Sequence, residues 1–374
     1  SDNIQMWEES SEITCPGNAA TQRLKEFHCS WAPSSFTSIE SLDDSSVSKY
    51  NVEDLCIRRV LGQGSFSTAH LVNLKQGHAG HSNSVDTCVM KRLKPVIVMN
   101  RRASNVAASD LALEAQILAN LQHTNIISLR GICSGDLHES LNKGEFFILV
   151  DLLVDTLDAR LLRWTKRKFR LLPPSKPSLK DRLNDIAVGI ADGMSYLHAK
   201  QLIFRDLKPA NIGFDKNGTV KLFDFGFARE HKGSGELRKQ QRRMTGGTGT
   251  PRYMAPEVAR MEEDYGFSAD VYSFAILLWQ IVTTRVPFSE FKTPTEFYAK
   301  VVLGEQRPSL KYLKNDDLAT LISQCWSPDP KKRLTFPNIR CQLENIIKST
   351  PDPRKRLTFP NIRSRLESII KSKS

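Results

Sequence analysis

The sequence predicts an α+β fold in which a β-rich part comes first and a largely helical part follows. Residues 55–74 have the pattern of two strands joined by a glycine turn, and residues 87–93 and 145–153 are further strand candidates. Apolar residues in 110–121 fall on one face of a helix, and residues 183–197 form a second apolar helix. With 374 residues, the chain is long enough for one large domain or two ordinary ones.

Composition and charge exclude several classes of protein. The 53 Lys and Arg residues outnumber the 41 Asp and Glu residues, which gives a net charge of +12 at pH 7. This balance favours acidic partners in a general way and says nothing about the fold. The basic residues are scattered, so we expect no nucleic-acid partner. No apolar run reaches the roughly 18 residues that a membrane span needs.

The cysteines indicate the compartment. Seven of them lie far apart in the sequence, mostly among apolar residues. An odd number without regular spacing predicts neither a disulfide framework nor a zinc site. We therefore expect reduced thiols in an intracellular, cytoplasmic protein.

Both ends of the chain differ from its middle. Residues 1–50 are rich in Ser, Thr, Asp and Glu without a sustained period, which predicts a flexible extension. Residues 327–349 recur as residues 350–372. The two copies differ at five positions, which in the first copy are 327, 331, 341, 342 and 345. Because the first copy follows an apolar Cys-Trp pair directly, we assign it the structural role and treat 350–374 as a duplicated segment.

Polar residues are concentrated in a short stretch between apolar runs. Arg205 and Asp206 are followed by Lys208, Asn211 and Asp224. Burying such groups without partners is costly, so a metal ion with a phosphate is one expected partner. A turn between buried strands would explain Asp-Phe-Gly alone. It does not explain both clusters in this order and spacing.

This stretch resembles the catalytic loop, H-R-D-L-x-x-x-N, and the D-F-G motif of the eukaryotic protein kinases. The resemblance implies that Asp206 accepts the proton of the substrate hydroxyl and that Asn211 and Asp224 hold Mg²⁺. It also implies that Lys208 lies beside the transferred phosphoryl group, as in the Ser/Thr branch of the family. Phe204 replaces the family's His, and we expect its ring to pack in an apolar column between two lobes.

The same resemblance implies an ATP site in the β-rich part. Its residues are Leu61, Gly62, Gly64, Ala69, Lys91, Glu114, Val150, Asp151 and Leu153. Gly62 and Gly64 let the backbone approach a phosphate, although any hairpin can carry this pair and Ser67 replaces the family's third glycine. Lys91 would hold the α- and β-phosphates and pair with Glu114. Taken alone, Lys91 is better explained as a surface lysine on an edge strand.

The adenine ring is expected at the connection between the two parts. By resemblance, Val150 lies at the back of the adenine pocket, and Asp151 to Leu153 present backbone groups to the edge of the ring. A plain core strand would carry the same apolar sequence, so this assignment depends on the resemblance.

Residues 224–257 match the family's activation segment, which ends in Ala-Pro-Glu. Thr245 and Thr248 are the expected phosphoacceptors within it. Arg205 could pair with their phosphate and order the segment, which implies an upstream kinase. Thr250 matches the threonine that supports the catalytic loop.

Three further residues match structural positions of the family. Asp270, near the start of a buried central helix, would hold the backbone of the catalytic loop. Arg333 would pair with Glu257. The sequence around Asp270 and Arg333 most resembles the tyrosine-kinase-like group of Ser/Thr kinases.

The resemblance covers residues 55–349 and implies a two-lobed protein kinase fold. A small β-rich N-lobe (55–152) with one key helix would precede a larger helical C-lobe (153–349), with ATP and Mg²⁺ between them. The implied activity is transfer of the γ-phosphoryl group of ATP to Ser or Thr hydroxyls of protein substrates in intracellular signalling. The alternatives are a pseudokinase that binds partners without turnover, favoured only by Ser67 and Phe204, and dual or tyrosine specificity, disfavoured by the catalytic-loop lysine.

Overall fold

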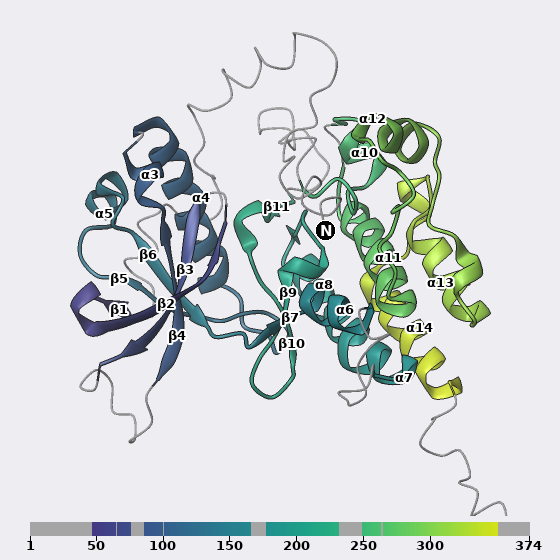
Figure 1. The fold of residues 1–374 in the computed structure, drawn as a ribbon, viewed down its shortest axis with the longest axis horizontal. Helices are drawn as coiled ribbons and strands as arrows, with labels where there is room; N and C mark the ends of the chain where they lie inside the picture. The colour runs from purple at the N-terminus through teal and green to yellow at the C-terminus, as the bar shows by residue number, and fades with distance from the viewer. Residues whose placement is uncertain are drawn as a thin grey trace, which may run out of the picture.

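The structure is a computed structural model that describes residues 47–64, 66–75, 86–99, 101–165, 177–231, 249–262 and 265–350. These residues form two lobes, a β-rich N-lobe and a helical C-lobe (Figure 1). The predicted α+β, two-lobed architecture is therefore confirmed. Thr245, Thr248 and residues 351–374 lie outside the described residues, as does most of the predicted N-terminal extension.

The N-lobe is organised around a six-stranded sheet with the order β1-β5-β6-β4-β3-β2. Its strands are β1 (Lys49–Tyr50), β2 (Leu55–Gln63), β3 (Ser67–Leu74), β4 (Thr87–Leu93), β5 (Leu129–Cys133) and β6 (Phe147–Asp151). The predicted glycine hairpin is formed by β2 and β3, which pair antiparallel. The predicted strand at 87–93 is β4, and the strand predicted at 145–153 is the shorter β6.

Strand β1 was not predicted, because the sequence analysis placed residues 49 and 50 in the N-terminal extension. It pairs in parallel with β5 at the edge of the sheet, where Ser134 N donates to Tyr50 O at 2.8 Å. Strand β5 leaves room for β1 at Gly131. A Cβ on Gly131 would lie 2.5 Å from the Tyr50 ring and 2.7 Å from Ser48 O. A two-residue strand has no periodicity that could have shown it in advance.

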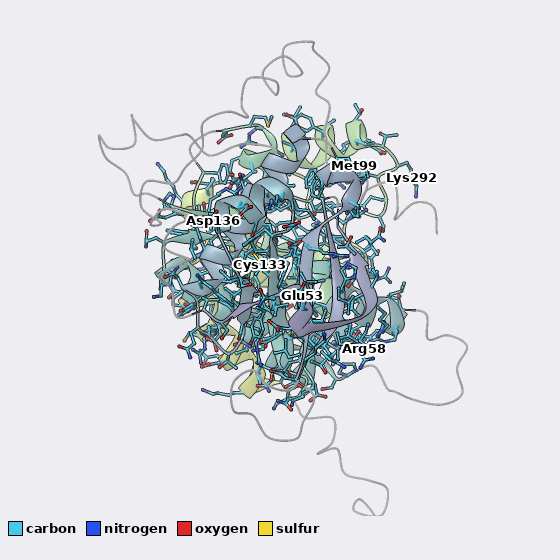
Figure 2. All side chains as sticks on the ribbon, turned by 90° about the vertical axis from the view of Figure 1, so that its left-hand side faces the viewer. Glu53, Arg58, Met99, Cys133, Asp136 and Lys292 are labelled. Atoms are coloured by element: carbon cyan, nitrogen blue, oxygen red, sulfur yellow. The ribbon has the colours of Figure 1, made fainter. Side chains whose placement is uncertain are left out.

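One long helix packs against the N-lobe sheet. Helix α4 (Arg101–Ala119) begins nine residues before the predicted 110–121 and buries Leu111, Ile117 and Leu118 among its core residues. Two short helices, α3 (Pro95–Val98) and α5 (Leu137–Lys143), flank it in sequence. Met99, which follows α3, is 87% exposed and is labelled at the surface in Figure 2.

The C-lobe is built from helices around a buried central one. They are α6 (Leu157–Thr165), α7 (Leu179–Arg182), the π-helix η4 (Leu183–Ala187), α8 (Val188–Ala199), α10 (Pro256–Ala259), α11 (Ser268–Thr283), α12 (Pro294–Phe297), the π-helix η7 (Tyr298–Leu303), α13 (Asp316–Cys325) and α14 (Phe336–Ser349). Every residue of α11 from Ala269 to Ile281 is buried, as expected for a helix that is apolar on all sides. The helix predicted at 183–197 consists of η4 and α8. None of the described helices is long and apolar enough to cross a membrane.

Short elements between the lobes position the polar stretch of the sequence. Strands β7 (Asp155–Thr156), β9 (Ile212–Phe214) and β10 (Val220–Leu222) form one small sheet, and β8 (Leu202–Ile203) with β11 (Arg229–Glu230) forms another. The 3₁₀ turns among the described residues are η2 (Val52–Asp54), η5 (Pro209–Asn211), η6 (Phe225–Phe227), η8 (Leu310–Tyr312) and η9 (Pro330–Lys332). The predicted catalytic loop thus runs from β8 to β9, held at both ends by strand pairing.

Candidate active site

Asp206 is fixed by hydrogen bonds on both of its carboxylate oxygens. Oδ2 lies 3.0 Å from Asn211 Nδ2 and 2.9 Å from Lys208 Nζ. Oδ1 accepts from both the backbone N and Oγ1 of Thr250, each at 2.9 Å. Lys208 Nζ also donates to Thr250 Oγ1 at 2.8 Å, so the two residues enclose the carboxylate. Asp206 is 4% exposed, and these four contacts hold its carboxylate in one orientation.

The backbone of this loop is anchored to the central helix. Asp270, near the start of α11, accepts from Phe204 N at 2.9 Å and from Arg205 N at 2.8 Å. His198 Nε2 lies 2.9 Å from the same carboxylate. Arg205 has a φ of 73°, an unusual backbone conformation for a residue with a side chain. The buried Asp270 therefore holds the loop in a strained shape that places Asp206.

Lys91 joins three elements that are far apart in the sequence. Its Nζ lies 2.6 Å from Glu114 Oε2 on α4 and 2.9 Å from Asp224 Oδ1, at the start of η6. Burial alone would lower the pKa of Lys91, but the carboxylates of Asp224 and Glu114 outweigh it and raise this pKa. The Lys91 ammonium holds the pKa of Asp224 below its usual range. The Lys91 ammonium and the Asp224 carboxylate are therefore charged at neutral pH, whereas burial raises the pKa of Glu114 despite the nearby Lys91.

Asn211 and Asp224 offer oxygen ligands close to Asp206. The Asn211 side-chain amide nitrogen is used by Asp206, which leaves its Oδ1 as the atom suited to a cation. Phe223 N donates to the backbone O of Asn211 at 3.1 Å, which brings the loop and Asp224 together. The described residues contain no group of three or more His, Cys, Asp and Glu residues arranged for a metal. One carboxylate and one amide suit Mg²⁺, which is usually bound by one or two carboxylates together with substrate phosphates.

Phe204 occupies the position of the family's His. It is 1% exposed and meets the ring of Phe225 edge to face, with centroids 5.1 Å apart and planes at 77°. Such pairs are favourable beyond their burial. The expected packing role is thus visible in the structure, and the ring links the catalytic loop to the turn after Asp224.

The glycine turn lies in the β2–β3 hairpin. Gly64 N donates to Ser67 O at 2.9 Å, and a Cβ on Gly62 would have no neighbour within 4 Å. Ala69 pairs with Gly62 on one side and with Lys91 on the other, so these residues share one patch of sheet. Leu61 is 38% exposed beside them.

The connection between the lobes contains the three residues expected near adenine. Val150 of β6 is 8% exposed and pairs with Val89 of β4. Asp151 is the last residue of β6. Leu153 packs on β9, where a Cβ on Gly213 would lie 2.4 Å from its Cδ1.

Sequence reasoning missed an arginine that supports this connection. Arg130 NH1 lies 3.5 Å from Asp151 Oδ1, and its NH2 lies 2.7 Å from Asp86 Oδ2. Nothing near Arg130 in the sequence indicates this pairing, because it arises only from the register of β5 against β6.

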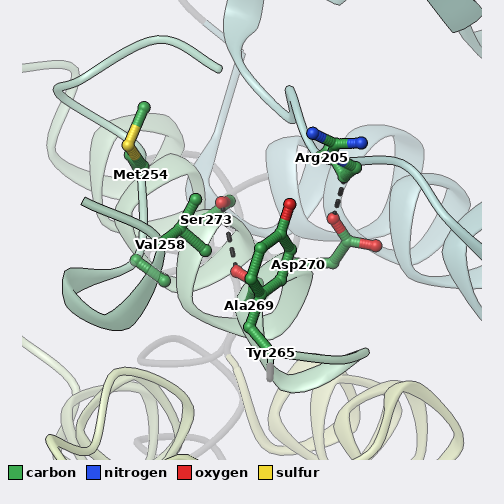
Figure 3. A pocket seen from close by; sticks show the side chains of 8 residues that line it. Arg205, Met254, Val258, Tyr265, Ala269, Asp270 and Ser273 are labelled. Atoms are coloured by element: carbon green, nitrogen blue, oxygen red, sulfur yellow. Dashed lines mark hydrogen bonds between the residues drawn. The ribbon is translucent and has the colours of Figure 1, made fainter. Parts of the chain in front are cut away.

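A second missed arginine lies close to Arg205. Burial and the neighbouring charge of Arg205 lower the pKa of Arg229 to about 10. Its NH1 donates to the carbonyl oxygens of Gly226 and Ala228, at 2.8 and 2.7 Å. Beside Arg205, a cavity of about 10 Å³ is lined by residues that include Tyr265 and Asp270 (Figure 3). Arg229 is therefore close enough to Arg205 to feel its charge, and its NH2 lies 3.5 Å from Asp110 Oδ1 of α4.

Arg333 and Glu257 form a buried two-pronged ion pair. NH1 lies 2.6 Å from Oε1 and NH2 lies 2.9 Å from Oε2. Arg333 also donates to the backbone O of Ser268 at 2.9 Å and of Ser327. The end of the activation segment is thereby tied to α11 and to the segment before α14.

A two-lobed fold with a lysine–glutamate pair, a fixed catalytic-loop aspartate and an aspartate–asparagine oxygen site defines the class of protein. Residues 56–343 match the family model described as protein kinase domain. The chain belongs to the protein kinase family, as the sequence analysis predicted.

Proteins that are similar to this chain are also named protein kinases. The chain is 31% identical over 296 residues to dual specificity protein kinase shkA of Dictyostelium discoideum, covering 79% of this chain and 50% of the relative. It is 31% identical over 284 residues to serine/threonine-protein kinase STY46 of Arabidopsis thaliana, covering 75% and 45%. For STY17 of the same plant the identity is 30% over 259 residues, covering 69% and 40%. The chain thus matches half or less of the length of these relatives.

Proposed function

We propose that this chain is an active protein kinase that transfers the γ-phosphoryl group of ATP to Ser and Thr hydroxyls of protein substrates. The observation that carries the proposal is the simultaneous engagement of Lys91 with Glu114 and Asp224. Protein kinases need the lysine–glutamate pair and the metal-binding aspartate in place together. A pseudokinase would have no reason to keep both contacts together with a fixed Asp206.

Each site residue has a role in this proposal. Lys91 binds the α- and β-phosphates, and the turn at Gly62 and Gly64 covers them with backbone. Asn211 and Asp224 would hold Mg²⁺, which when bound supplies charge neutralisation at the phosphate oxygens. Asp206 orients the acceptor hydroxyl and takes its proton.

The acceptor class is proposed from Lys208. Its Nζ reaches both Asp206 and Thr250, so it lies beside the atom at which transfer would occur. Relatives are named both serine/threonine-protein kinase and dual specificity protein kinase. We therefore rank Ser and Thr first and dual specificity second.

The acceptor class can be tested by labelling. The protein is incubated with radiolabelled ATP and Mg²⁺, with a generic basic protein substrate and with itself, and the hydrolysed product is separated into phosphoamino acids. We expect label on phosphoserine and phosphothreonine. Additional label on phosphotyrosine would show that the enzyme has dual specificity and is not specific for Ser and Thr.

We also propose regulation through the activation segment. Phosphate on Thr245 or Thr248 would bind Arg205, and Arg229 adds a second cation at the same place. Alanine at both threonines should lower activity to the same extent as Arg205→Ala, and the two changes together should add little. Full additivity would show that the arginine does not act on the phosphate.

An intracellular, cytoplasmic location is proposed from the thiols. Cys88 and Cys325 are buried free cysteines, and burial raises the pKa of each to about 12. Such thiols are inert packing residues, and free cysteines without disulfides are typical of a reducing compartment.

A further inference from the structure

The repeated C-terminal sequence contributes a defined set of core side chains in its first copy. Five residues of 327–349 are buried: Arg333, Phe336, Ile339, Leu343 and Ile346. Four of them lie on one face of α14, which packs against α8 and α13 and is drawn in yellow in Figure 1. The ring of Phe336 lies 4.9 Å from that of His198 and 5.4 Å from that of Phe274. This helix therefore fills a groove of the C-lobe.

The second copy carries every one of these side chains. The corresponding residues are Arg356, Phe359, Ile362, Leu366 and Ile369. The five first-copy residues that differ between the copies are half-buried or exposed: Ser327, Lys331, Cys341, Gln342 and Asn345. Residues 350–372 can thus supply the same apolar surface to the same groove.

The polar contacts of the first copy are also available to the second. Arg333 pairs with Glu257, and Arg340 NH1 lies 2.7 Å from Asp192 Oδ1. Asp329 Oδ1 accepts from Lys331 N at 3.0 Å at the start of the turn η9. The second copy has Arg356, Arg363 and Asp352 at these places.

We propose that residues 327–349 and 350–372 are alternative occupants of one groove, so that the second copy can replace the first within the same chain. The fixed point of the exchange is Trp326, whose backbone O accepts from Arg307 Nε at 3.2 Å. In the alternative register, the 23 residues of the first copy form a loop between Trp326 and the second copy. Closing such a loop disfavours that register by on the order of a hundredfold, so the first copy predominates.

Changing Phe336 alone tests the exchange. Phe336→Asp places an unpaired charge in the groove and should expel the first copy. The full-length variant should still unfold cooperatively, with its thermal midpoint lowered by on the order of 5–10 °C, which corresponds to the hundredfold penalty. Hydrogen exchange with mass spectrometry should show protection moved from residues 336–349 to residues 359–372. The two peptides can be told apart because Cys341, Gln342 and Asn345 differ in the second copy.

Two matched variants complete the test. Phe359→Asp alone should leave both the thermal midpoint and the protection of 336–349 unchanged, because the first copy occupies the groove. Phe336→Asp with Phe359→Asp should abolish the cooperative transition of the C-lobe.

Three results would overturn the proposal. The first is that Phe336→Asp alone abolishes the cooperative transition, as the double change does. The second is that hydrogen-exchange protection remains at residues 336–349 in Phe336→Asp. Protection of 359–372 that appears only at high protein concentration would assign the second copy to a neighbouring molecule.

Discussion

Individual buried charges in this kinase are satisfied by a few identified partners, which makes single substitutions informative. Four charged residues are at most 7% exposed: Asp206, Asp270, Glu257 and Arg333. A charge at such a depth is tolerated only because it is paired and hydrogen-bonded. Removing one member of a pair therefore costs more than the pair itself contributes.

Glu257→Gln should lower the free energy of unfolding by about 3–5 kcal/mol, because it leaves the Arg333 guanidinium buried without its counter-charge. Urea denaturation of both proteins measures the difference. Arg340→Gln, which affects the half-exposed pair with Asp192, should cost less than about 1 kcal/mol and serves as control. Equal losses in both variants would contradict the account.

Phe204→His should change kcat less than about threefold, because the ring acts by packing against Phe225. Phe204→Ala should instead lower the free energy of unfolding by about 3–5 kcal/mol through the cavity it creates. Steady-state kinetics and denaturation of the two variants separate these effects. A gain of tenfold or more in Phe204→His would show that the natural Phe limits turnover.

At the scale of elements, the site is assembled by strand register and by the ends of helices. The register of β4 against β3 brings Lys91 opposite Ala69, and the start of α11 places Asp270 beneath the catalytic loop. Glycine makes room where elements meet closely, as at Gly131 beneath β1. The pairing of β1 with β5 therefore depends on the space that Gly131 leaves for Tyr50 and Ser48.

Gly131→Ala should detach β1 without disrupting the rest of the sheet, because the added methyl group would overlap the Tyr50 ring and Ser48 O. We expect faster hydrogen exchange in residues 47–51 and an unfolding free energy lowered by about 1–3 kcal/mol. Gly62→Ala meets no neighbour within 4 Å and should leave this exchange unchanged. Unaltered exchange in Gly131→Ala would show that β1 does not depend on this contact.

Much of the site could be predicted because its motifs are local in sequence. The stretch from Arg205 to Asp224 gives residue types, order and spacing together, and strand β4 was predicted at its observed bounds. What could not be predicted depends on contacts between distant segments. Arg130 meets Asp151 only through sheet register, Arg229 meets Arg205 only through the fold, and β1 is too short to show a period.

At the scale of the whole molecule, Lys91 is one point at which the lobes are joined electrostatically, and the pair of Arg229 with Asp110 is another. It belongs to the N-lobe sheet, Glu114 belongs to the N-lobe helix, and Asp224 comes from the C-lobe side of the cleft. The contacts that place the lobes relative to each other are therefore the same ones that position Lys91 for its proposed role in phosphate binding.

Lys91→Met should lower kcat/KM for ATP by at least about 100-fold, because the charge that we propose to contact the phosphates is lost. It should also destabilise the fold, since Glu114 remains buried without its cation. Adding Glu114→Gln should restore the thermal midpoint and leave activity low. Recovery of activity in the double variant would contradict the proposed role of Lys91.

The central claim, that Asp206 carries out phosphoryl transfer at a preformed site, is tested most directly by Asp206→Asn. Single-turnover transfer from radiolabelled Mg-ATP to a basic protein substrate is measured beside ATP affinity by calorimetry. We expect ATP to bind within about threefold of the parent affinity, because Asp206 does not contact the Lys91 group, while transfer falls by at least about 100-fold, as expected for loss of a general base. Transfer at the parent rate in the variant would contradict the assignment.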